Sequence, residues 1–180
     1  MSMFEGLTCA RAAIVGALAL AAGAAAAADT PRLGQPISPA DAAQWDISIG
    51  PDGAGLPAGS GTPAQGAVVY AQKCAACHGD KGEGKTNNRL VGGQITGGGP
   101  VVKTVGSYWP YATTLFDFTR RAMPWTAPKS LSDNEVYAVT AYILRLNGII
   151  GDNDVIDAKT LPQVKMPNRD GFIPLFPGKH

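Results

Sequence analysis

Two cysteines and a histidine stand close together in the segment Cys74-Ala75-Ala76-Cys77-His78. Thiols at this spacing lie one helical turn apart, and each can add to one vinyl group of a haem, so the segment is the attachment sequence for c-type haem. The imidazole of His78 then meets the iron from the same side, as its proximal ligand. The motif therefore predicts one haem c, attached covalently through Cys74 and Cys77.

Other chemistry is open to a Cys-x-x-Cys pair. A redox pair of the thioredoxin kind follows a strand, whereas the residues before Cys74 have the pattern of a helix. A structural zinc ion needs four ligands, and beyond the N-terminal segment the sequence offers Cys74, Cys77, His78 and the terminal His180. A plain disulfide between Cys74 and Cys77 is the third alternative. Haem attachment uses all three residues of the motif and is the interpretation we favour.

The second axial position of the iron needs another side chain. A thioether is a natural partner for histidine there, and it raises the reduction potential. Met123 and Met166 are the methionines beyond the N-terminal segment. Because Pro124 disfavours helical backbone at Met123, we expect an extended loop there that can present the sulfur across a haem plane. We predict His78 and Met123 as the axial ligands. Met166, His180 and an iron with no second protein ligand are the alternatives.

Helical signals recur along the chain, and we find no strand alternation. Capping residues and apolar periodicity predict helices at residues 38–45, 62–75, 113–121 and 133–146. The second of these runs into the cysteine motif, the third ends just before Met123, and the fourth is expected to cross the second. The predicted fold class is all-α, and a haem would supply much of the core that a loop-rich chain lacks.

Two finer contacts are also expected. Gly66 lies inside the predicted helix 62–75, where glycine costs about 1 kcal/mol relative to alanine, so another helix should approach it closely. Metal-bound histidines usually donate a hydrogen bond from their second ring nitrogen. A backbone carbonyl near Gly99 and Pro100 is our candidate to accept that bond from His78.

The first 28 residues have the features of a targeting segment. Residues 12–20 form an apolar run of nine, and Ala26-Ala27-Ala28 fits the small-x-small rule for signal peptidase. The run is shorter than the about 20 residues that cross a bilayer. We expect a cleaved signal peptide over residues 1–28, which removes Cys9, and a periplasmic protein that begins at Asp29. A buried alanine-rich helix and a retained anchor are the alternatives.

The remaining chain divides into three predicted parts. These are an N-terminal extension at residues 29–61, a haem domain at 62–148 and a C-terminal tail at 149–180. The tail contains four prolines, and its apolar residues show little of the spacing that is typical of a helix. Its many apolar residues argue against plain disorder, so we expect it to pack on the haem domain or on a partner.

Composition excludes several classes of protein. The 15 basic and 14 acidic residues give a net charge of +1, whereas nucleic-acid-binding domains normally carry a basic stripe. Mean hydropathy is close to zero, unlike that of a protein with many membrane spans. Charged residues make up 16% of the chain, against about 25% in average soluble proteins.

Several segments resemble known families. The motif with Gly79, the pair Met123-Pro124 and residues 131–144 resemble class I cytochrome c, over about residues 63–148. Residues 45–47, 51–57, 102–111 and 166–169 resemble the cytochrome subunits of bacterial sulfur-compound dehydrogenases. These are the cytochromes of sulfite dehydrogenase and of the sulfane dehydrogenase of the thiosulfate-oxidising Sox system.

The resemblance implies a fold, a site and a partner. The implied fold is that of class I cytochrome c, with an N-terminal extension and a long wrapping C-terminal tail. Haem attachment at Cys74 and Cys77 and axial ligation by His78 and Met123 are implied as well. In that family a molybdenum subunit oxidises the sulfur compound and the cytochrome takes the electrons. Some sulfane dehydrogenase cytochromes carry two haems, whereas this sequence has one Cys-x-x-Cys-His motif.

The implied function is electron transfer. We expect a periplasmic monohaem cytochrome that accepts electrons from a molybdenum-containing sulfite or sulfane dehydrogenase subunit and delivers them to a downstream cytochrome or oxidase. By itself it would catalyse no reaction, bind no nucleic acid and have no membrane span. A free-standing cytochrome shuttle is one alternative, and a haem enzyme or sensor with an open iron site is another.

Overall fold

The computed structural model describes residues 34–173. The predicted signal peptide, Cys9 and His180 lie outside these residues. The described residues fall into two units, with the boundary between Trp45 and Asp46. Within residues 34–173, no helix combines the length and the apolar character that a membrane crossing requires.

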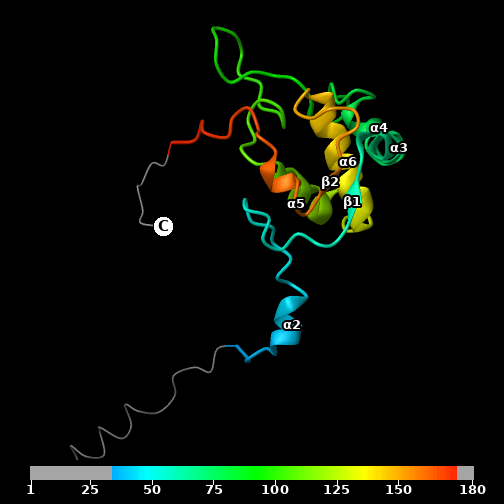
Figure 1. The fold of residues 1–180 in the computed structure, drawn as a ribbon, viewed down its shortest axis with the longest axis vertical. Coiled ribbons are helices and arrows are strands. Elements are labelled where there is room, and N and C mark those ends of the chain that lie inside the picture. The colour runs from blue at the N-terminus through cyan, green and yellow to red at the C-terminus, as the bar shows by residue number, and fades with distance from the viewer. Residues whose placement is uncertain (1–33, 174–180) are drawn as a thin grey trace, which may run out of the picture. The chain divides into compact units, whose positions relative to one another are not determined.

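Helices are the main regular elements of the described chain, and long loops connect them, as Figure 1 shows. In chain order the elements are α2 (Pro39–Ala43), β1 (Ser60–Gly61), α3 (Pro63–Lys73), α4 (Ala75–His78), α5 (Ala112–Ala122), α6 (Asp133–Leu146), β2 (Ile156–Asp157) and the 3-10 turn η1 (Leu161–Gln163). The four predicted helices are present. The helix expected at residues 62–75 is α3, which ends at Lys73, and the separate short helix α4 that follows it was not predicted.

In the first unit, α2 is a capped helix of five residues. The hydroxyl of Ser38 accepts a hydrogen bond from the backbone N–H of Asp41 at 3.1 Å, and Pro39 occupies the first turn. These are the residues that predict the helix in the sequence. None of its residues is buried, so local capping rather than a core determines where it begins.

In the second unit, α3 packs against α6, as expected from Gly66. A Cβ built on Gly66 would overlap the backbone carbonyl of Ala138 in α6. Glycine therefore allows the two helices to approach closely, which offsets its low helix propensity. One turn further along α3, the ring of Tyr70 packs on that of Tyr142, with the ring centroids 5.2 Å apart.

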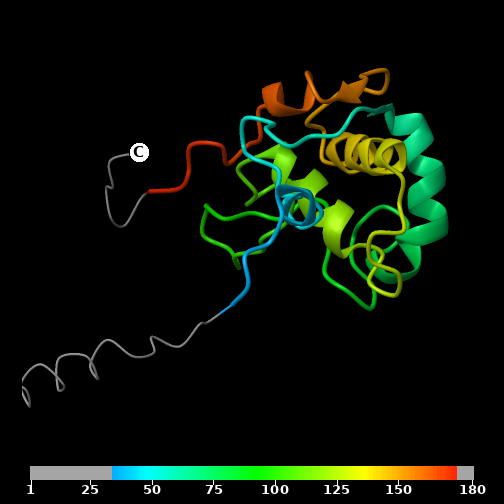
Figure 2. The ribbon, with the colours of Figure 1, turned by 90° about the horizontal axis from the view of Figure 1, so that it is seen from below.

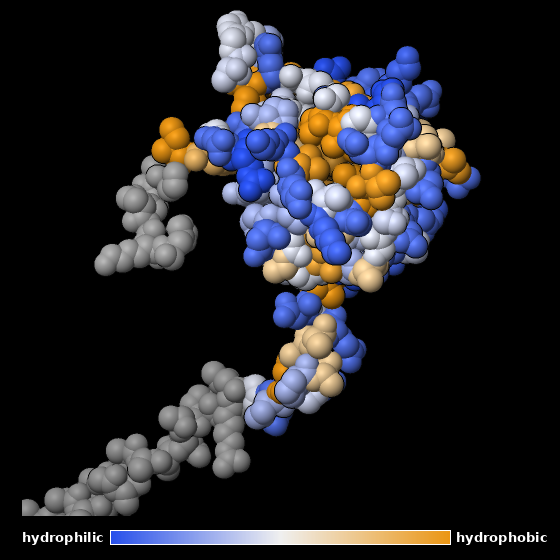
Figure 3. All heavy atoms as spheres, viewed as in Figure 1, coloured by the Kyte–Doolittle hydropathy of each residue, from blue (hydrophilic) through white to orange (hydrophobic). Residues whose placement is uncertain are grey.

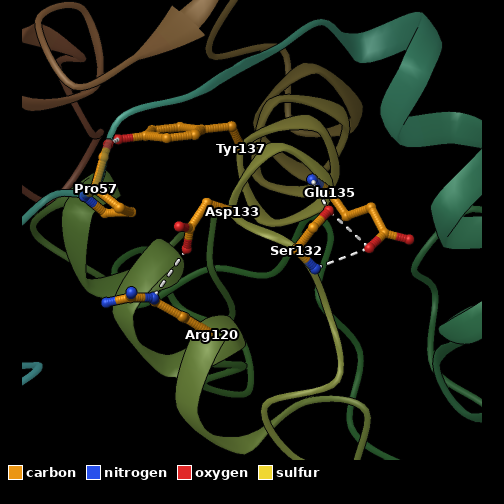
Figure 4. Close-up of polar contacts among 6 residues, drawn as sticks. All are labelled: Pro57, Arg120, Ser132, Asp133, Glu135 and Tyr137. Atoms are coloured by element: carbon orange, nitrogen blue, oxygen red, sulfur yellow. Dashed lines mark hydrogen bonds and ion pairs between the residues drawn. The ribbon is translucent and has the colours of Figure 1, made fainter. Parts of the chain in front are cut away.

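Helix α6 is the centre of the core. Eight of its residues are buried, and the ring of Phe116 from α5 lies against that of Tyr137 with a centroid distance of 4.4 Å. A capping box fixes its start, because Ser132 and Glu135 exchange side-chain and backbone hydrogen bonds. Figure 4 shows this box beside the ion pair between Arg120 and Asp133, which joins α5 to α6 at 3.1 Å.

Segments on either side of residues 62–148 pair with each other. Ser60 and Gly61 of β1 pair antiparallel with Asp157 and Ile156 of β2. In Figures 1 and 2 the cyan segment that leads to β1 runs beside the orange segment that contains β2 and η1. This two-stranded ladder was not predicted, because two residues are too few to show alternation.

The segment after α6 contributes to the same core. Ile156, Leu161 and Met166 are at most 3% exposed and belong to one hydrophobic cluster with Tyr137 and Leu144. Before β1, the backbone carbonyl of Pro57 accepts a hydrogen bond from the hydroxyl of Tyr137 at 2.8 Å, which Figure 4 also shows. Residues 46–61 and 149–168 are thus held to α6 by burial and by hydrogen bonds.

Candidate functional site

The cysteine motif lies on a short helical turn at the end of α3. Cys74 leaves helical geometry with φ −125° and ψ −39°, and α4 begins at the next residue. The backbone N–H groups of Cys77 and His78 both donate to the carbonyl of Cys74, at 3.1 and 3.0 Å. Gly79, with φ +84°, then ends the turn. This backbone holds the two thiols and the imidazole one turn apart, as haem attachment requires.

The thiols of Cys74 and Cys77 are free and half-buried. The structure therefore contains no disulfide between them. Within residues 34–173 it also contains no group of three or more His, Cys, Asp or Glu side chains that could hold a metal ion, which argues against the zinc alternative. Burial raises the pKa of the Cys74 thiol to about 11, so the unreacted side chain is a neutral thiol at pH 7.

A backbone carbonyl determines the orientation of His78. Its Nδ1 lies 2.7 Å from the carbonyl oxygen of Asn88. Because a carbonyl can only accept, Nδ1 carries the proton and Nε2 keeps the lone pair that can bind a metal. The acceptor expected near Gly99 and Pro100 was wrong. The loop after the motif turns back sooner, since Asn87 N–H donates to the Cys77 carbonyl at 2.9 Å and brings Asn88 to the ring.

Met123 directly follows α5. It has φ −117° and ψ 147°, the extended conformation that was expected before Pro124. The N–H of Met123 donates to the carbonyl of Thr119 at 3.1 Å, which anchors the loop to the end of the helix. By contrast, Met166 is 3% exposed within the hydrophobic core and does not line the cavity described next.

One cavity brings the predicted site residues together. It has a volume of about 510 Å³, and Cys74, Cys77, His78 and Met123 all line it. Such a volume lies within the range of roughly 300–1,000 Å³ that small-molecule and cofactor sites occupy. Its apolar wall comes from loops and from α5 and α6, and includes Leu90, Val105, Trp109, Leu115, Phe118, Val139 and Ile143.

The lining fits a covalently attached haem. It offers two free thiols, an imidazole with an available Nε2 and a thioether, and an apolar wall surrounds them. Such a wall favours burial of a porphyrin because it removes apolar surface from water. The indole of Trp109 also lines the cavity, while Tyr108 and Tyr111 do not.

Positive charge predominates at the cavity. Lys73, Arg89 and Lys103 line it, and no Asp or Glu of the described residues does. Of the three, Lys73 forms an ion pair with Glu135 at 2.8 Å. Arg120 and Arg121 of α5 do not line the cavity, and they form ion pairs with Asp133 and Asp117. The cations at the cavity come from loops and from the end of α3. Nothing in the sequence indicated that these three would gather, because they are 14 to 30 residues apart.

Comparison with known proteins supports the same assignment. Residues 61–143 match the family described as cytochrome C oxidase, cbb3-type, subunit III. A thiosulfate dehydrogenase of Stutzerimonas stutzeri (strain A1501) is 33% identical over 95 residues, which are 48% of this chain and 28% of that protein. The chain thus spans little more than a quarter of the length of this relative.

A solved structure matches more of the chain. It is a chain of the sulfane dehydrogenase SoxCD from Paracoccus pantotrophus, which is 41% identical with a TM-score of 0.73. The match covers 79% of this chain and 71% of that chain. Together with the lining of the cavity, this similarity shows that the chain belongs to the class I c-type cytochromes, with one covalently bound haem c as its cofactor.

Proposed function

We propose that this protein is a periplasmic monohaem cytochrome that takes electrons from a molybdenum-containing sulfite or sulfane dehydrogenase subunit. It would pass them to a downstream cytochrome or oxidase. The observation that carries this proposal is the single cavity lined by Cys74, Cys77, His78 and Met123. Two candidate axial ligands on one cavity favour electron transfer, because a fully ligated iron leaves no position for a small-molecule substrate.

Each residue of the site has a distinct task in this proposal. When bound, the haem supplies an iron that changes its oxidation state by one electron. Cys74 and Cys77 hold the cofactor covalently, and His78 is kept in one tautomer by the Asn88 carbonyl. Met123 supplies the thioether that raises the reduction potential. The apolar wall described above would pack on the porphyrin and reduce its contact with water.

The choice of partner rests on similarity. The two relatives described above are a thiosulfate dehydrogenase and a sulfane dehydrogenase, and the resemblance found in the sequence is to the cytochrome subunits of such enzymes. If this chain is the electron-accepting subunit of such a dehydrogenase, its similarity to these two enzymes is explained.

A reduction assay tests the partner. The holo-cytochrome is mixed with the molybdenum dehydrogenase subunit of the same organism, and the absorbance of reduced haem is followed after addition of sulfite or a sulfane-sulfur compound. We expect reduction only when subunit and sulfur compound are both present. A haem that stays oxidised with both would contradict the proposed function and favour a free-standing shuttle.

The periplasmic location rests on the N-terminal sequence. The run of small residues before Asp29 has the form of a signal-peptidase site. The mass of the exported protein checks this directly, since cleavage after Ala28 leaves residues 29–180. Recovery of the full-length chain in the cytoplasm would contradict it.

A further inference from the structure

Two segments outside the haem domain form one layer on it. The segment before α3 and the segment after α6 are joined by the ladder between β1 and β2. A Cβ built on Gly53 would come within 2.5 Å of the side chain of Pro162, so these segments also touch away from the ladder. Figure 2 shows them side by side, above α5 and α6.

The C-terminal part of this layer reaches the rim of the haem cavity. The amide Nδ2 of Asn168 donates to the backbone carbonyl of Tyr108 at 2.7 Å. The rings of Phe172 and Tyr108 meet edge to face, with their centroids 5.2 Å apart. The ammonium of Lys103 lies 4.6 Å from the centroid of the same Tyr108 ring, and Lys103 lines the cavity. Tyr108 therefore connects the tail to the cavity.

Apolar side chains are left exposed where these contacts end. Phe172 is 48% exposed, and its neighbour Ile173 is 92% exposed. We call these two residues with Lys103 the tail-rim surface. In Figure 3 the last described residues before the grey trace are apolar and lie on the outside of the molecule. Large apolar side chains gathered at one exposed site commonly mark a contact with another protein.

The similarity to sulfane dehydrogenase extends beyond the haem domain. The cytochrome family match covers 83 residues, from 61 to 143. The structural match to the SoxCD chain covers 79% of this chain, or about 142 residues. About 60 matched residues therefore lie outside the part that this chain shares with the broader cytochrome family. Binding of a dehydrogenase would be specific to cytochromes that resemble the SoxCD chain, and not general to the broader cytochrome family.

We propose that the tail-rim surface is where the dehydrogenase subunit docks, an inference that rests on the proposed function. The matching surface of that subunit would have an apolar recess for Phe172 and Ile173, with carboxylates around it. Carboxylates are expected because Lys103 belongs to the surface and Arg169 lies three residues before Phe172. In addition, no acidic side chain of the described chain lines the cavity beside it. Between residues 166 and 173 of the tail, Asp170 is the acidic residue and Arg169 the basic one. Docking here brings the donor to the edge of the haem site.

Two substitutions with matched controls test the surface. Ile173→Ser removes an apolar side chain that is almost fully exposed, and Val68→Ser makes a similar change on the 58% exposed Val68 of α3. Lys103→Glu reverses a charge at the rim, and Lys165→Glu makes the same change at an exposed position elsewhere in the tail. The probe is the molybdenum subunit that reduces the wild-type haem. Its dissociation constant is measured by calorimetry with each holo-protein.

We expect at least about a tenfold rise in the dissociation constant for Ile173→Ser, as for a central interface residue. Lys103→Glu should slow association and reduce its dependence on salt. Neither control should change binding. The haem spectrum should be the same in wild type, Ile173→Ser, Val68→Ser and Lys165→Glu, none of which changes a residue that lines the cavity.

Three results would overturn the inference. If Ile173→Ser and Lys103→Glu bind like wild type, the dehydrogenase docks elsewhere, while the proposed function stands. If the wild-type chain forms a dimer that Ile173→Ser dissociates, the surface is occupied by a second copy of this chain. If no molybdenum subunit binds or reduces the wild-type protein, the proposed function fails and this inference fails with it.

Discussion

At the scale of residues, the backbone around Cys74 prepares the site. Cys74 ends one helix and starts the next, and its carbonyl accepts hydrogen bonds from both Cys77 and His78. The two thiols are thereby held on one turn, and neither is lost to a disulfide. The side chains thus face a cavity in a fixed arrangement, which favours their reaction with a single cofactor.

Replacement of the cysteines tests covalent attachment. In the double variant Cys74→Ser with Cys77→Ser, we expect acid-acetone to extract all the haem, whereas wild type should keep it. His78 and Met123 remain as ligands in this variant, so some haem can still bind before extraction. The absorbance of the washed protein measures the outcome, and a wild-type protein that loses its colour would contradict attachment through these residues.

The sequence located these residues but missed some of their neighbours. Cys74, Cys77 and His78 are recognisable because their spacing is local, and Met123 because Pro124 constrains its backbone. The Asn88 carbonyl was missed because backbone groups leave no signal in side-chain identity. The gathering of three basic side chains at the cavity was missed because it depends on how loops fold.

At the scale of elements, helix caps explain why the helices could be predicted from the sequence. Helix α6 was predicted within its observed limits because Ser132 and Glu135 form a capping box in adjacent sequence. Strands β1 and β2 could not be predicted in the same way. Their ladder pairs Gly61 with Ile156, and nothing local in the sequence connects two residues on opposite sides of the haem domain.

The capping box of α6 also predicts a dependence on pH. Hydrogen bonds from Lys73 and then from Ser132 lower the pKa of Glu135 from 4.5 to about 2. A carboxyl group whose pKa is lower in the folded state stabilises the fold above its unfolded pKa. This contribution is therefore complete above about pH 4.5 and is lost as the pH falls toward 2. The pair between Lys73 and Glu135 is partly exposed, so its own share is about 0.2–1 kcal/mol.

Helix α3 provides the control for this prediction. Its capping box pairs Thr62 with Gln65, which does not titrate. Glu135→Gln should lower the free energy of unfolding at pH 7 but have little effect near pH 2. Gln65→Ala should lower the free energy of unfolding by a similar amount at pH 7 and near pH 2. Urea unfolding at each pH measures these differences, and an equal cost of Glu135→Gln at both pH values would refute the proposed linkage.

At the scale of the whole described chain, the segment after α6 is part of the core of the second unit. Leu161 is fully buried in the cluster that contains Tyr137 and Leu144. We expect Leu161→Ala to lower the free energy of unfolding by about 2–5 kcal/mol, the usual cost of such a cavity. Val155→Ala, at a 50% exposed position of the same segment, should cost no more than about 0.5 kcal/mol.

Denaturant unfolding followed by circular dichroism measures both variants. If Leu161→Ala were as stable as Val155→Ala, the segment would not be packed on the haem domain in solution. The sequence showed that residues 149–180 were too apolar for plain disorder, but it could not show which side chains would be buried. That depends on contacts with residues far away in the chain.

The most direct test of the account is the visible spectrum of the oxidised holo-protein. Ligation of ferric iron by a methionine sulfur gives a weak absorption band near the red edge of the visible range. We predict this band in wild type and in Met166→Leu, and its loss in Met123→Ala, which should also bind carbon monoxide when reduced. A wild-type protein that lacks the band and binds carbon monoxide readily would contradict ligation by Met123 and electron transfer as the function.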